Sequence, residues 1–233
     1  IAISLILSIC ACSEKPKYEK GFSVTITDTT QLDKGLVLDT TKFETRPSTV
    51  LISSLPNVRL TTIYKVNTNK EDLSKYIGSN AHHFNYSNYS ENLGNNWNNN
   101  FMPGIDAIYG FNMVNISLFD VNTQTKKLLF DKPVLIRTLY YPAYSNDTLN
   151  NKKIERNFIM ISVYNEDTNN DGAINTKDLR RIYLFDAKGN KMKALIPENY
   201  AVLKSEYDPG NDYMYIFGQQ DHNNNGLQDT DEP

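Results

Sequence analysis

Strand-length runs of β-branched, aromatic and other apolar residues recur along this sequence and limit the folds open to it. Some runs alternate with polar residues in period two and others are continuously apolar, the patterns of half-buried and fully buried strands. The runs are Phe22–Thr27, Leu36–Leu38, Val50–Ser53, Val58–Val66, Ile116–Asp120, Val134–Tyr141, Phe158–Tyr164, Arg181–Asp186 and Tyr213–Phe217. With 233 residues, 39% of them hydrophobic, the chain is long enough to bury a core. The sequence therefore predicts an all-β body.

Two of these runs belong to a partial internal repeat. Ile116–Asp120 reads Ile-Ser-Leu-Phe-Asp and returns as Ile182–Asp186, which reads Ile-Tyr-Leu-Phe-Asp. Each copy is followed by a turn that contains lysine and by a second short strand. Units of this kind resemble the blades of TolB-like propellers, and the resemblance implies a propeller-like antiparallel meander. A β-sandwich, in which such hairpins arise independently, is the alternative.

A second correspondence, at an offset of 54 residues, sets Ile159–Ile161 against Tyr213–Tyr215 and leads into two loops rich in Asp and Asn. In the first loop, residues 167–178, oxygen-bearing side chains stand at positions 1, 3, 5, 9 and 12, and glycine at position 6 permits a sharp turn. Ca²⁺ takes about six to eight oxygen ligands, and this spacing lets one short loop supply them. The predicted ligands are Asp167, Asn169, Asp171, the carbonyl of Ala173, Asn175 and Asp178.

The second loop, residues 221–232, reads Asp-x-Asn-x-Asn-Gly and carries glutamate at position 12. Its predicted ligands are Asp221, Asn223, Asn225, the carbonyl of Leu227, Asp229 and Glu232. Asn225 stands where a carboxylate would bind more strongly, so this site is predicted to be the weaker one. The alternative for both loops is an ordinary hairpin turn, since Asp-Gly and Asn-Gly are common there.

Both loops resemble EF-hand calcium loops, and the first is closest to the dockerin type, whose twelfth residue is also aspartate. The resemblance is confined to the loops and implies calcium as the bound ion. An EF-hand places helices on both sides of its loop, whereas Phe158–Tyr164 and Arg181–Asp186 are strand-like. We therefore expect structural calcium sites between strands, without a helix pair that opens.

The first twelve residues are uncharged and largely apolar, and they end in Cys10-Ala11-Cys12 before a charged segment begins. The stretch is shorter than the about 20 residues of a membrane-spanning helix, but it suits the apolar region and cleavage site of a secretory signal. It resembles a bacterial lipoprotein signal, which implies that Cys12 is acylated. Residues 13–20 would then be a tether and residues 21–233 one β-rich domain. The alternative is a buried N-terminal strand with two free thiols.

An Asn-rich segment from Phe84 to Pro103 also carries aromatic residues. Tyr86, Tyr89 and Trp97 could stack on sugar rings while asparagine amides bond the hydroxyl groups, so these three are candidates for glycan binding. The alternative is a surface loop whose aromatic side chains pack into the core.

Charge and motifs narrow the function. Lys and Arg number 24 against 27 Asp and Glu, a balance that disfavours nucleic acid as a partner. No nucleophile elbow, phosphate loop or His-Glu-x-x-His motif is present, so the sequence does not favour an enzyme. The whole resembles lipoproteins of Bacteroidetes that carry such loops, which implies calcium and an outer-membrane location, periplasmic or surface-facing, but no activity. We expect a lipid-anchored binding or scaffold protein for a glycan or a partner protein; a polysaccharide-acting enzyme or enzyme subunit is the alternative.

Overall fold

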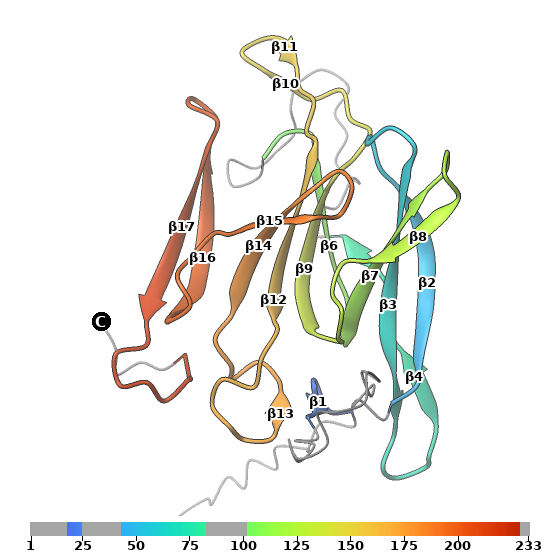
Figure 1. Ribbon diagram of the computed structural model, residues 1–233, viewed down its shortest axis with the longest axis vertical. Coiled ribbons are helices and arrows are strands. Elements are labelled where there is room, and N and C mark those ends of the chain that lie inside the picture. The colour runs from blue at the N-terminus through green and yellow to red at the C-terminus, as the bar shows by residue number, and fades with distance from the viewer. Residues whose placement is uncertain (1–17, 25–42, 83–101, 229–233) are drawn as a thin grey trace, which may run out of the picture.

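The computed structural model of this chain describes residues 18–24, 43–82 and 102–228 (Figure 1). Within these ranges every regular element is a β-strand, and all paired strands run antiparallel. The all-β prediction is therefore confirmed. Cys12, Tyr86, Tyr89, Trp97, Asp229 and Glu232 lie outside the described residues.

One open sheet of eleven strands dominates the structure. Its main path runs in the order β15 (Lys191–Ala194), β14 (Arg181–Asp186), β12 (Phe158–Tyr164), β9 (Leu135–Pro142), β7 (Met113–Asp120), β3 (Val58–Thr68) and β2 (Thr45–Ile52). Four shorter strands join this path, namely β4 (Lys75–Ile77) on β3, β8 (Thr125–Leu128) on β7, β6 (Ile105–Tyr109) on β9 and β5 (Ala81–His82) on β6. None of the described sheets closes on itself.

Three two-stranded sheets flank the large one. They pair β1 (Phe22–Ser23) with β13 (Ala173–Ile174), β10 (Thr148–Leu149) with β11 (Lys152–Lys153) and β16 (Tyr200–Asp208) with β17 (Tyr213–Gln220). Figure 1 shows the β16–β17 hairpin beside β14 at one side of the molecule. The small β1–β13 sheet lies near the lower end of the large sheet in the same view.

Alternation along the central strands supplies the main core. Leu60, Ile116, Leu139, Ile161 and Phe185, one from each of β3, β7, β9, β12 and β14, are fully buried in one apolar cluster. A second, smaller cluster joins Phe22 of β1 and Ile174 of β13 to residues of β7, β9 and β12. The second cluster therefore packs the N-terminal strand and the middle of the first Asp/Asn-rich loop against the large sheet.

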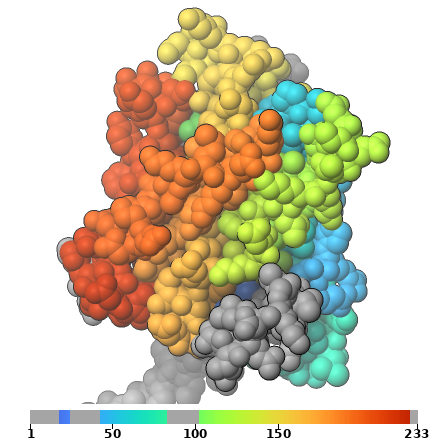
Figure 2. Space-filling model, in the orientation of Figure 1, coloured from blue at the N-terminus to red at the C-terminus, as the bar shows by residue number. Residues whose placement is uncertain are grey.

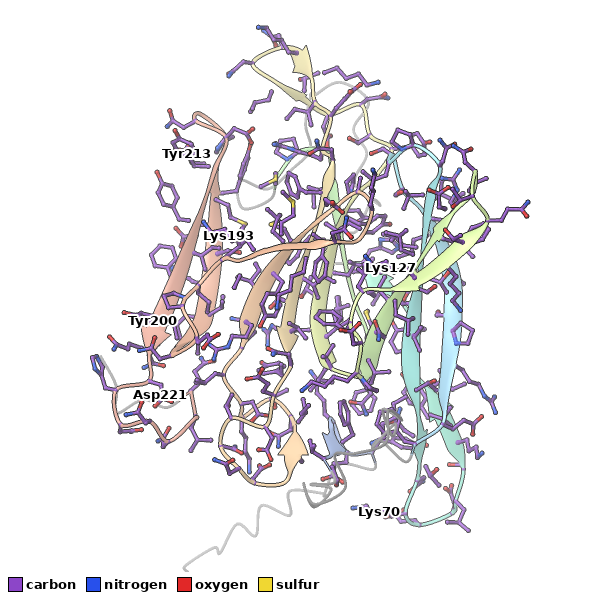
Figure 3. The ribbon with its side chains drawn as sticks, viewed as in Figure 1. Lys70, Lys127, Lys193, Tyr200, Tyr213 and Asp221 are labelled. Atoms are coloured by element: carbon purple, nitrogen blue, oxygen red, sulfur yellow. The ribbon has the colours of Figure 1, made fainter. Side chains whose placement is uncertain are left out.

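The two Leu-Phe-Asp segments form equivalent hairpins, β7–β8 and β14–β15. Asp120 ends β7 and accepts the backbone N–H groups of Asn122 and Thr123, at 2.9 and 3.0 Å. Asp186 ends β14 and likewise accepts the N–H groups of the turn that follows it. The Nζ of Lys127, labelled in Figure 3, donates to Asn190 in that second turn, at 2.8 Å. Both hairpins belong to the same large sheet.

Three arginines attach the β16–β17 hairpin to the body. Arg156 donates to both carboxylate oxygens of Asp212 in the hairpin turn, at 2.9 and 2.7 Å, and Tyr207 donates to the same carboxylate at 2.8 Å. Burial, reinforced by Asp212, raises the pKa of Tyr207 to about 12. Arg180 donates to the carbonyl oxygens of Val202 and Leu203, and Arg181 donates to those of Pro197 and Tyr200.

Acid is expected to weaken this attachment. The hydrogen bond from Arg156, helped by that from Tyr207, lowers the pKa of Asp212 below its ordinary value of about 4. The stabilisation is therefore complete above about pH 4 and is lost as the pH falls through the lower pKa of the folded state. Urea unfolding between about pH 2 and pH 6 checks this: Arg156→Met should remove part of the acid-dependent loss of stability. Equal pH slopes for the two proteins would contradict the prediction.

Candidate metal centre

The first Asp/Asn-rich loop, residues 167–178 and called loop 1 below, connects β12 to β14. It therefore joins two strands, as its flanking sequence predicts. Positions 7 and 8 of loop 1 form β13, and Ile174 pairs with Phe22 of β1. Val24 also donates its backbone N–H to the carbonyl of Gly172, at 2.8 Å. The N-terminal segment thus holds loop 1 from outside while Ile174 anchors it to the core.

Side-chain oxygens in the first half of loop 1 accept the backbone N–H groups of its tight turn. The carboxylate of Asp167 accepts the N–H groups of Asp171 and Gly172, at 3.1 and 2.9 Å. The Oδ1 of Asn169 also accepts the N–H of Asp171, at 3.0 Å. Asp171 in turn accepts the N–H of Ala173, at 3.0 Å. Positions 1, 3 and 5 therefore all direct oxygen atoms toward the interior of the turn.

Loop 2, the second Asp/Asn-rich loop, repeats this network bond for bond over residues 221–228, its described part. Asp221 accepts the N–H groups of Asn225 and Gly226, at 3.1 and 3.0 Å. Asn223 accepts the N–H of Asn225, at 2.9 Å, and Asn225 accepts that of Leu227, at 2.8 Å. Loop 2 follows β17 and begins one residue after that strand ends.

The backbone conformation of the two loops also matches. Position 4 has a positive φ in both, 57° at Asn170 and 55° at Asn224. Position 6 is glycine in both, with φ of 84° at Gly172 and 70° at Gly226. Asparagine and glycine are the residues that reach this left-handed region most readily. Two segments far apart in the sequence have therefore adopted one local structure.

Three predicted ligands of loop 1 converge on one another. The Nδ2 of Asn175 lies 3.0 and 3.3 Å from the two carboxylate oxygens of Asp171, and the Nδ2 of Asn169 lies 3.5 Å from one of them. The hydrogen bond from Asn175 is the main cause that lowers the pKa of Asp171. The side chains at positions 3, 5 and 9 therefore gather at one place, where the two amide groups donate to the Asp171 carboxylate.

Asp178, the predicted ligand at position 12, is fully buried. Its two carboxylate oxygens accept the backbone N–H groups of Thr168 and Asn175, both at 2.8 Å. Burial raises the pKa of this carboxyl, against the opposing effect of the backbone hydrogen bonds. Asp178 therefore ties the start of loop 1 to its end, whatever else it binds.

The two loops pack directly against each other. The Oγ1 of Thr168 donates to the carbonyl of Gly226 at 2.6 Å and accepts the N–H of Leu179 at 2.9 Å. Asp178 and Leu227 form an antiparallel β-bridge between the loops. Thr168 stands at the variable position 2 of loop 1, where the calcium pattern gives no signal that would identify it.

Beyond the loops, the described residues add little that resembles a metal or catalytic site. The described residues, those of loops 1 and 2 included, contain no group of three or more His, Cys, Asp or Glu side chains placed to hold a metal ion. Nor do they include a helix long and apolar enough to cross a membrane. Comparison of the chain with protein-family models, with curated proteins and with solved structures gave no match.

Proposed function

We propose that this protein is a non-catalytic binding or scaffold protein of the bacterial cell envelope, anchored by a lipid at Cys12, whose β body is stabilised by calcium in loops 1 and 2. The observation that carries the proposal is the hydrogen-bond network shared by the two loops. Packing of the loops against each other adds to it, because ions held there would stabilise the junction between the large sheet and the β16–β17 hairpin.

The donor chemistry of loop 1 fits Ca²⁺. Asp167, Asn169, Asp171, Asn175 and the carbonyl of Ala173 are all oxygen donors within one turn, and Asp178 closes it. Ca²⁺, when bound, would supply charge neutralisation and a cross-link between these oxygens. With few carboxylates, such a site belongs to the weak extracellular class with dissociation constants of about 10⁻⁴–10⁻³ M. Loop 2 fits less well, since Asn225 replaces the aspartate.

Calcium is expected to raise the melting temperature. At a Ca²⁺ concentration about ten times the dissociation constant, one site contributes about 1.4 kcal/mol, or about 3–6 °C for a chain of this size. Thermal unfolding in EDTA and in millimolar Ca²⁺ measures the shift. The Asp167→Ala and Asp171→Ala variants should each lose the contribution of loop 1.

Asp186→Ala is the matched control for these variants. Asp186 also accepts turn N–H groups, but it lies in the β14–β15 hairpin rather than in a loop of the calcium pattern. This variant should melt at a lower temperature and still show the full calcium shift. Superimposable melting curves for the unsubstituted protein with and without Ca²⁺ would show that both loops are only turns.

The polysaccharide-acting enzyme is not favoured. A cavity of about 560 Å³ between the N-terminal segment and β3 contains two carboxylates, Glu19 and Glu44. Lys75 and Arg46 lower the pKa of Glu44, whereas a general acid needs a raised pKa. Glu19 is paired with Lys70 at 3.6 Å. Both carboxylates are therefore engaged in surface ion pairs.

Of the propeller-type arrangement, we propose only that the chain contains a repeated unit. The unit is a strand followed by an Asp/Asn-rich loop, as in β12 and loop 1 and again in β17 and loop 2. The shared loop network and the offset of 54 residues support that unit.

A further inference from the structure

A stripe of exposed aromatic side chains runs along β17. Tyr213, Tyr215 and Phe217 are 63%, 53% and 41% exposed, and they share one face of the strand because alternate residues of a strand point to the same side. Among the described strands, β17 pairs only with β16, and no described strand pairs with its other edge. The hairpin forms the border of the molecule in the view of Figure 2.

In β12, the strand of the first unit, the residues at the positions equivalent to this stripe are buried. At the offset of 54 residues, the stripe on β17 corresponds to Ile159, Ile161 and Val163 of β12. All three are fully buried in the main core. β12 also has partners at both edges, β9 and β14, and loop 1 leads directly into β14. The exposed face and edge of β17 therefore correspond to surfaces that are covered in β12.

The composition of β17 makes its edge receptive to another strand. Tyr213–Gln220 contains neither charged residue nor proline, the two devices by which edge strands resist pairing. The exposed parts of its three rings present about 300 Å² of largely apolar surface, the size of the largest patch on many monomers. On the same face β16 places Glu206 opposite Tyr215 and Asp208 opposite Tyr213, so acidic groups border the stripe.

We propose that β17 docks an extended polypeptide segment as an added antiparallel strand with the side-chain pattern of β14. In the first unit, Phe185, Tyr183 and Arg181 of β14 lie opposite Ile159, Ile161 and Val163. In the equivalent register, the docked strand would place phenylalanine opposite Tyr213, tyrosine opposite Tyr215 and arginine opposite Phe217. The two aromatic pairs are favourable cross-strand contacts.

The charges beside the stripe limit what can dock there. Glu206 is paired with Lys204 at 2.5 Å, and the Nζ of Lys204 also lies 4.5 Å from the centre of the Phe217 ring. Asp208 lies opposite Tyr213, so the docked strand is expected to place an uncharged or basic residue beside Tyr213, as phenylalanine in the pattern of β14 does. The inference rests on the proposed binding role of the protein but not on its calcium sites, because β17 presents this surface whether the loops are filled or empty.

The test uses a fluorescent peptide with the sequence of residues 180–187, added to the protein while anisotropy and amide hydrogen exchange are measured. We expect saturable binding together with slower exchange in β17. A peptide carrying N-methyl groups on alternate amides should not bind, because an added strand is held by backbone hydrogen bonds. Tyr215→Lys should weaken binding about tenfold, since it removes an aromatic pair and places lysine on the edge strand. Tyr144→Lys, at a residue 71% exposed but outside the hairpin, should not change it.

Three results would overturn the proposal. The first is absence of saturable binding at millimolar peptide. The second is that, without peptide, amide exchange in β17 becomes slower as the protein concentration rises. This would identify a second copy of the chain as the occupant. The third is equal slowing by a neutral oligosaccharide, which would identify a glycan. The calcium-induced shift of the melting temperature, measured on the same sample, reports separately on the proposed calcium sites.

Discussion

Replacing Gly226 by alanine is expected to lower the free energy of unfolding by about 2–5 kcal/mol. An added Cβ would lie 1.9 Å from the carbonyl oxygen of Thr168, which belongs to the backbone of loop 1 and has no side-chain freedom to move aside. The φ of 70° adds the strain of a left-handed conformation, worth about 1–2 kcal/mol. Urea unfolding at constant calcium measures the loss.

Gly172→Ala is the matched control. Gly172 stands at the same position of loop 1 with a φ of 84°, but a Cβ added there meets nothing within 4 Å. This variant should lose only the backbone contribution of about 1–2 kcal/mol. The difference between the two variants therefore measures the contact between the loops. Equal losses would mean that the loops can separate at little cost.

Replacing Asp178 by alanine is expected to cost about 2–5 kcal/mol even in EDTA. The substitution removes the acceptor of two backbone N–H groups, those of Thr168 and Asn175, and a buried donor without a partner costs about 1–3 kcal/mol. Asp178→Asn retains one oxygen and should recover part of the loss. Thermal or urea unfolding of the three proteins without calcium gives the comparison.

The calcium dependence of this loss separates two roles of Asp178. A residue that closes loop 1 through its backbone bonds destabilises the protein when removed at any calcium concentration. A residue that serves only as a metal ligand has no effect until calcium is present. A loss seen exclusively in millimolar Ca²⁺ would therefore contradict the structural role assigned to the buried carboxylate.

Local patterns in the sequence predicted the parts of the fold that depend on neighbouring residues. Phe158–Tyr164 and Arg181–Asp186 form β12 and β14 with the expected bounds, because alternation and β-branching act within each strand. The turn in each loop also follows from local chemistry, since the side-chain oxygens of positions 1, 3 and 5 accept N–H groups at most five residues away.

These local patterns did not predict contacts between residues that are far apart in the sequence. Thr168 and Gly226 meet across 58 residues, and neither carries a signal of the other in a single sequence. The strand β6 is short and follows the Asn-rich segment in the sequence, and it was not predicted. The sequence also left the order of the strands in the sheet undetermined. For example, β7 pairs with β3 on one side and with β8 on the other, and this choice depends on packing rather than on the sequence of any one strand.

The pairing of β1 with β13 gives loop 1 a mechanical role. Lys65 grips the N-terminal segment through the carbonyl of Gly21, Asn112 accepts the N–H of Gly21, and β13 holds Phe22 and Ser23. If the N-terminus is lipid-anchored as proposed, tension on it would reach the body in part through these bonds. Loop 1 then carries part of this tension, because β13 within it pairs with β1. An ion that stiffens loop 1 should raise the force needed to separate β1 from β13.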